Sequence, residues 1–129
     1  MDNGYNPIRW RCQSNGCYLT ECHPKIEVFA DCFPNRIAMS DIDGVVEING
    51  HFIFMEWKGH GGKLTDGQKT LINRMTALSE KVIFFVVYGD SKTMEVTEFY
   101  RYHKDKRYHY KAGLDVLKEH FEIWAKAVK

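Results

Sequence analysis

The stretch "DIDGVVEINGHFIFMEWKG", residues 41–59, decides the fold of this chain because it contains a strong hairpin signal. Two apolar runs flank Asn49-Gly50. An Asn-Gly pair between such runs favours a two-residue type I′ turn. The sequence therefore predicts an antiparallel hairpin over roughly residues 38–58, with its pairing register fixed by the turn.

Four charged side chains lie at the end of this hairpin that is far from the turn. The register places Asp43 across from Glu56, and Asp41 across from Lys58, all on one face of the sheet. Two carboxylates whose Cβ atoms are about 5 Å apart repel each other unless a positive charge lies between them. A divalent metal ion would relieve this repulsion. The alternative is a surface salt bridge between Asp41 and Lys58, which contributes little to stability.

A helix and a buried strand follow the hairpin. Thr65 or Asp66 can cap a helix that begins near Gly67. After it, "KVIFFVVYG" (81–89) has the continuous apolar run of a strand that is covered on both faces. We expect this strand to return parallel to the second hairpin strand by a right-handed crossover. The apolar stripe of the helix is expected at Leu71, Met75 and Leu78.

The two ends of the chain give weaker patterns. Residues 1–23 predict an irregular arm, and "PKIEVFADCF" (24–33) predicts a short helix that Pro34 ends. Residues 93–102 alternate like a half-buried strand, and "RYHKDKRYHYK" (101–111) is interpreted as a basic, tyrosine-containing loop. The closing segment predicts an amphipathic helix with Leu114, Leu117, Phe121 and Trp124 on one face.

Length and charge narrow the class of protein. The 129 residues favour one domain, and the net charge of +1 argues against a generally basic nucleic-acid binder. The longest apolar run, Val82–Val87, is too short to span a bilayer, and residues 1–15 lack a signal-peptide pattern. We therefore expect a cytoplasmic protein without a membrane partner.

The cysteines allow two interpretations. All four of them lie in the first quarter of the chain, where a reducing cytosol disfavours disulfides. They could bind Zn²⁺, with His23 as an alternative ligand, although no Cys-x2-Cys pair is present. The other interpretation is free, partly buried thiols. The four residues are Cys12, Cys17, Cys22 and Cys32.

The charged end of the hairpin also resembles a known signature. Asp43 followed by Glu56-Trp57-Lys58 is similar to the motif of the PD-(D/E)xK nuclease superfamily. The Glu-x-Lys part is matched in full at the end of an apolar strand. The proline is not matched, because Ile42 stands in its place.

Two further features strengthen this resemblance. "GQKTL" (67–71) looks like the glutamine motif of stand-alone, virus-type replication-repair nucleases (VRR-NUC) and of Holliday-junction-resolvase-like relatives. Glu27 matches an acidic residue of the preceding helix, which would hold a metal-bound water or a second metal. The resemblance covers residues 24–90. It implies a restriction-endonuclease-like α/β fold, a mixed sheet with an α-β-β-α-β core, to which 91–129 add a strand, the basic loop and the closing helix.

The resemblance implies a role for each motif residue. Asp43, Glu56 and the backbone carbonyl of Trp57 would bind Mg²⁺ or Mn²⁺, since hard cations prefer oxygen ligands. Lys58 would orient the attacking water and neutralise developing charge. Gln68 would position Lys58, the water or a substrate phosphate. Together these roles predict hydrolysis of DNA phosphodiester bonds by a metal-activated water, either as a general endonuclease or with selectivity for DNA structure.

Surface residues and assembly complete the interpretation. The basic segment suits phosphate contacts and stacking of unpaired bases, although a solvated loop is the alternative. A homodimer would complete the DNA-binding surface of so small a chain. The alternative function is a non-catalytic module that binds nucleic acid or protein on a nuclease-like scaffold stabilised by zinc. The residues expected to contact nucleic acid are Lys63, Arg101, Lys104, Lys106, Arg107 and Tyr108.

Overall fold

The computed structural model describes residues 24–129, which belong to two compact units that divide between Met39 and Ser40. In the first unit, η2 (Ile26–Cys32) is a 3-10 helix without a buried residue. The short helix predicted here is therefore present, but it has the tighter 3-10 form and its phenylalanines are exposed. The predicted irregular arm, 1–23, lies outside the described residues.

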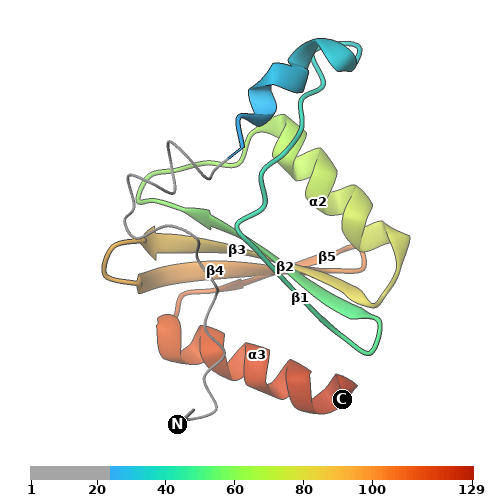
Figure 1. Ribbon diagram of the computed structural model, residues 1–129. Coiled ribbons are helices and arrows are strands. Elements are labelled where there is room, and N and C mark those ends of the chain that lie inside the picture. Colours follow the sequence, from blue (N-terminus) through green and yellow to red (C-terminus); the bar gives the residue numbers. More distant parts are fainter. Residues whose placement is uncertain (1–23) are drawn as a thin grey trace, which may run out of the picture. The chain divides into compact units, whose positions relative to one another are not determined.

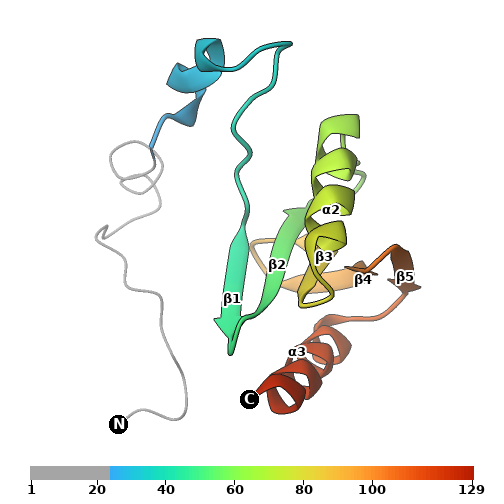
Figure 2. The same cartoon turned by 90° about the vertical axis from the view of Figure 1, so that its right-hand side faces the viewer.

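The second unit, Ser40–Lys129, is built on a five-stranded mixed sheet with the strand order β1-β2-β3-β4-β5. Helices α2 and α3 cover its opposite faces (Figure 1), and the strands run in this order from one edge of the sheet to the other (Figure 2). The elements are β1 (Gly44–Ile48), β2 (His51–Lys58), α2 (Asp66–Leu78), β3 (Val82–Asp90), β4 (Glu95–His103), β5 (Lys106–Tyr110) and α3 (Leu114–Val128).

The β1–β2 hairpin has the register that the Asn-Gly turn predicts. Asn49 and Gly50 both have positive φ angles, 51° and 81°, as a type I′ turn requires. Ile48 pairs with His51, and the ladder ends where Gly44 pairs with Met55. The first strand is thus shorter than predicted, because it begins at Gly44 and not near residue 38.

The apolar run of β3 forms the centre of the sheet. It pairs parallel with β2 and antiparallel with β4, so the predicted parallel return after α2 is confirmed. Phe84 to Val87 are at most 2% exposed because alternate side chains enter the two opposite cores. Phe84 and Val86 face α2, whereas Phe85 and Val87 face α3.

Helix α2 buries a different stripe from the predicted one. Ile72 and Thr76 are its buried residues, and Met75 packs beside them against the sheet. Leu78 is 82% exposed because it is the last residue of the helix. Its inclusion in the apolar stripe was wrong.

The predicted basic loop is a strand instead. β4 and β5 pair antiparallel around a tight turn in which Lys104 has a φ of 59°. Residues of β5 therefore alternate between the two faces of the sheet. Arg107 pairs with Tyr102 on the α2 face, and Tyr108 pairs with Arg101 on the α3 face.

The closing helix is confirmed. Leu117 of α3 is buried in the core on its side of the sheet, and Leu114, Phe121 and Trp124 pack against the same core. The Asn49 side-chain amide donates a hydrogen bond to the carbonyl of Val128 (2.9 Å), which ties the hairpin turn to the end of α3. Within residues 24–129, no helix has the length and apolar character needed to cross a membrane.

Candidate active site at the open end of the hairpin

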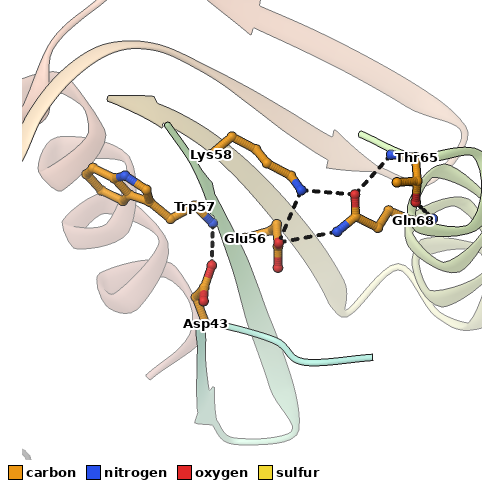
Figure 3. Close-up of polar contacts among 6 residues, drawn as sticks. All are labelled: Asp43, Glu56, Trp57, Lys58, Thr65 and Gln68. Atoms are coloured by element: carbon orange, nitrogen blue, oxygen red, sulfur yellow. Dashed lines mark hydrogen bonds and ion pairs between the residues drawn. The ribbon is translucent and has the colours of Figure 1, made fainter. Parts of the chain in front are cut away.

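Asp43 lies one residue before β1 and closes the open end of the hairpin. Its Oδ2 accepts a hydrogen bond from the backbone N–H of Trp57 at 2.6 Å (Figure 3). In the observed register, a longer β1 would have offered the Ile42 carbonyl to this N–H. The Asp43 carboxylate takes that place, so it is held beside Glu56 as the register predicts.

Glu56, Lys58 and Gln68 converge on one another next to Asp43 (Figure 3). Lys58 Nζ donates to Gln68 Oε1 at 3.0 Å and lies 3.6 Å from Glu56 Oε2. Gln68 Nε2 donates to the same Glu56 oxygen at 3.4 Å. The Glu56 and Lys58 side chains are only 14% and 18% exposed, so these contacts form away from bulk water. The structure therefore brings together the four residues predicted to be catalytic.

Gln68 reaches this position because it is part of the cap of α2. The Thr65 hydroxyl accepts from the Gln68 backbone N–H (3.1 Å), and Gln68 Oε1 accepts from the Thr65 N–H (3.0 Å). This reciprocal pair is a capping box, with glutamine in the third position of the helix. The same Oε1 atom also accepts from Lys58, so the start of α2 and the end of β2 are joined through one side chain.

The pKa of Glu56 reflects its burial first and its charged neighbours second. Burial raises the pKa of its carboxyl group, and the negative charges of Asp43 and Asp41 raise it further. Lys58 lowers this pKa through its charge and a hydrogen bond, but the net shift is upward. Lys58 thus offsets only part of the effect that burial and Asp43 have on Glu56, and a cation bound beside Glu56 would favour its charged form.

The donor atoms at this end of the sheet suit a hard divalent cation. The N–H and C=O of Trp57 both face β1, and the β1–β2 ladder ends before reaching them. The Trp57 carbonyl is thus directed to the same side as Asp43. Among the described residues, no group of three His, Cys, Asp or Glu side chains could hold a metal. Mg²⁺ typically takes only one or two carboxylates and completes its shell with other oxygens, so Asp43, Glu56 and this carbonyl fit it.

Other predicted site residues have different positions. Asp41 precedes β1, outside the ladder that was expected to pair it with Lys58, yet its charge acts on Glu56. Lys63 is an exposed residue of the segment between β2 and α2. Glu27 lies in η2, in the unit described separately from this site, so its predicted metal role stays a prediction. The same holds for zinc, because Cys32 is an exposed free thiol and Cys12, Cys17 and Cys22 lie outside the described residues.

The predicted nucleic-acid contacts of β4 and β5 are divided between the two faces. Arg107 shares the α2 face with Glu56, since the pairs run from β2 through β3 and β4 to β5. Arg101 and Tyr108 lie on the α3 face, with the guanidinium 4.6 Å from the tyrosine ring centre. Lys106 also lies on the α3 face, and Lys104 lies in the β4–β5 turn, so Arg107 is the one residue of β4 and β5 in this predicted set that shares a face with Glu56.

Sequence reasoning expected base stacking by the tyrosines of residues 101–111, but it missed that Tyr88 and Tyr100 join this segment in one polar aromatic surface on the α2 face. Tyr88 pairs with Lys58 across β2 and β3, and its phenol lies near those of Tyr100 and Tyr102. Burial raises the pKa of Tyr88, and these neighbours raise it further, so its hydroxyl stays protonated. The alternation of tyrosines in β4 was a usable signal, but the partner residue His109 was hidden in the supposed loop.

Comparisons with known proteins identify no relative of this chain. No protein-family model matches the chain, and neither a curated protein nor a solved structure matches it significantly. The function must therefore be argued from the residues themselves.

Proposed function

We propose that the unit Ser40–Lys129 is a metal-dependent phosphodiester hydrolase that cleaves DNA, of the PD-(D/E)xK class with a restriction-endonuclease-like core. The single observation that supports this most directly is the position of Lys58 Nζ, 3.6 Å from Glu56 Oε2 and 3.0 Å from Gln68 Oε1. A lysine, a carboxylate and a glutamine amide in contact, with a second carboxylate next to them, match the residue types that this chemistry needs.

The carboxylates would hold the cation. Mg²⁺ or Mn²⁺ bound by Asp43, Glu56 and the Trp57 carbonyl would supply positive charge for the phosphoryl oxygens and lower the pKa of a bound water. The Trp57 N–H fixes one oxygen of Asp43, so this carboxylate is oriented before any ligand binds. Because that bond sets its direction, the orientation of Asp43 does not depend on a proline at position 42.

Lys58 would act on the attacking water and on the phosphate. An ammonium group has three N–H donors, of which one is accepted by Gln68 Oε1 and a second is directed at Glu56 Oε2, 3.6 Å away. The third donor can orient a water molecule or contact a phosphoryl oxygen. Since the side chain is 18% exposed, its charge acts in a medium less polar than water, where such stabilisation is stronger. Gln68 is then a positioning residue, because it acts through Lys58.

The test is cleavage of supercoiled plasmid and of branched DNA with Mg²⁺ or Mn²⁺, comparing wild type with Lys58→Met. Methionine keeps much of the apolar stem and removes the charge. We expect a rate loss of about 100-fold or more, the usual cost of removing one transition-state donor. The matched control is Lys118→Ala, an exposed lysine of α3 on the other side of the sheet, which should cut like wild type. Equal cutting by Lys58→Met and wild type, or no cutting by wild type with either metal, would refute the proposal.

A further inference from the structure

The α2 face of the sheet carries a row of rings beside the proposed active site. We call this row the tyrosine–histidine strip. It crosses β3, β4 and β5, starting one strand away from Lys58, because Lys58 pairs with Tyr88 and Tyr88 pairs with Glu98. The strip consists of Tyr88, Tyr100, Tyr102, Arg107 and His109, with Glu98 at its edge.

Tyr100 is the centre of the strip. The His109 ring stacks on it with 4.3 Å between ring centres and an interplanar angle of 6°. The Arg107 guanidinium lies 5.3 Å from the centre of the same ring, and Tyr88 meets it edge-on at 6.0 Å. Tyr100 and Tyr102 also pack against the core under α2, so they form a fixed base for the more exposed His109 and Arg107.

His109 is held in one orientation. Tyr100 supports one face of the imidazole, and Glu98 Oε1 lies 2.5 Å from its Nε2. The His109 side chain nevertheless remains 36% exposed. The ring is therefore an ordered flat surface, which loses little conformational entropy when a second flat group stacks on it.

The residue types of the strip suit an unpaired nucleic-acid strand. A flat ring binds the face of a base, and only unpaired or splayed bases offer that face. Arg107 supplies a permanent positive charge for a phosphate next to the stacked base. In a duplex the base faces are stacked on one another, so the rings of the strip would have no partner.

We propose that the tyrosine–histidine strip binds an unpaired stretch of the substrate strand, with a base stacked on His109 and a phosphate on Arg107. The inference rests on the proposed function, in that the bound strand lies beside the scissile phosphate at Lys58. It implies that the substrate is single-stranded or contains a single-stranded segment, as a flap or a junction does.

Strand β5 provides a matched pair of variants. Arg107 and Lys106 are adjacent, exposed and positively charged, but they point to opposite faces of the sheet. Binding of a fluorescent single-stranded oligonucleotide in EDTA, followed by anisotropy, should weaken about 5-fold or more for Arg107→Ala, the effect of losing one charged contact. The Lys106→Ala variant should bind like wild type, because Lys106 points to the α3 face; the nucleic-acid contact expected of Lys106 from the sequence is not part of this proposal. Equal losses in the two variants would overturn the proposal, because they would show general electrostatic attraction.

A second pair tests stacking. His109→Ala should weaken single-strand binding about 5-fold to 150-fold, and His109→Phe should restore it, since stacking of one base contributes about 1–3 kcal/mol. An oligonucleotide with abasic positions should bind wild type as weakly as the intact one binds His109→Ala. Duplex binding as tight as single-strand binding would overturn the proposal, as would a His109→Phe variant as weak as His109→Ala.

These measurements are separate from hydrolysis. Binding in EDTA does not require cleavage, so a protein that binds through the strip without cutting would refute the nuclease proposal alone. A protein that cuts in a Lys58-dependent manner, but binds equally well after the Arg107 and His109 substitutions, would refute the strip alone.

Discussion

The carboxylate of Asp43 accepts a 2.6 Å hydrogen bond from the backbone N–H of Trp57, at the point where the β1–β2 ladder ends. The side chain thereby takes the position of a backbone acceptor and keeps the negative charge beside Glu56. One residue thus terminates the pairing of the strands and prepares the proposed cation site. Substitutions at this position can separate the two roles.

Asp43→Asn should keep the hydrogen bond and lose the charge, whereas Asp43→Ala should lose both. We expect Asp43→Ala to lower the free energy of unfolding by about 1 kcal/mol, the typical net contribution of such a bond. Asp43→Asn should lower it less. Both variants should lose DNA cleavage. Urea denaturation and plasmid cleavage measure the two effects, and a fully active Asp43→Asn would exclude Asp43 as a charged ligand.

Glu56→Gln should stabilise the protein at neutral pH in the absence of divalent metal. The pKa of Glu56 is raised above its ordinary value of 4.5, so the folded state holds this proton more tightly than the unfolded state does. As the pH rises from 4.5 through the raised pKa, wild type therefore loses stability that the glutamine variant keeps. Below pH 4.5 the two proteins should be equally stable. Urea denaturation across this range is the measurement, and a less stable variant at neutral pH would show that the attraction to Lys58 outweighs burial and repulsion.

Local sequence rules predicted the parts of the fold that depend on neighbouring residues. Asn49-Gly50 determined the turn and hence the register, and the apolar run of β3 predicted a strand buried on both faces. β5 was missed because its turn, Lys104-Asp105, contains neither glycine nor asparagine and its residues are mostly exposed. A polar edge strand has little hydrophobic periodicity to reveal it.

The sequence predicted the part of the candidate site that lies within β2, but not the contacts that join β2 to other elements. Alternation along β2 places Glu56 and Lys58 on one face, which the sequence alone implies. The contact between Lys58 and Gln68 depends on where α2 packs, and no local rule supplies that position. The ring stack of Tyr100 and His109 joins two strands, so it could not be predicted while one of them was interpreted as a loop.

Gly89→Ala should destabilise the C-terminal end of β3. A Cβ atom at this position would lie 2.0 Å from the backbone oxygen of Glu95, in the irregular pairing of β3 with β4. Because backbone atoms cannot move aside cheaply, we expect a loss of about 1–3 kcal/mol or more. The Gly89 carbonyl also accepts from the Trp57 indole (3.3 Å), so the site end of β2 should loosen as well. The control is Gly67→Ala in α2, where a Cβ meets nothing closer than 3.9 Å and stability should hold or rise. Equal stability of the two variants would show that this pairing is adaptable.

Mg²⁺ should stabilise wild type and leave the charge-removing variants unaffected. A ligand that binds only the folded state adds about 1.4 kcal/mol to the free energy of unfolding when its free concentration is ten times Kd. Urea denaturation with increasing Mg²⁺ should show this gain for wild type, and EDTA should reverse it. Asp43→Asn and Glu56→Gln should not respond. An equal response in wild type and both variants would place any bound cation elsewhere.

Gln68→Ala and Thr65→Ala distinguish helix capping from support of Lys58. Each variant breaks the capping box, so each should lose about 1 kcal/mol of stability. Only Gln68→Ala also removes the oxygen that holds Lys58 Nζ, at 3.0 Å, and the amide that donates to Glu56. We expect Thr65→Ala to cleave DNA at the wild-type rate per folded molecule, and Gln68→Ala to have a lower kcat with little change in KM. Measuring kcat and KM well below each variant's Tm separates helix capping from support of Lys58. Equal kcat values in the two variants would show that Gln68 acts only as a helix cap.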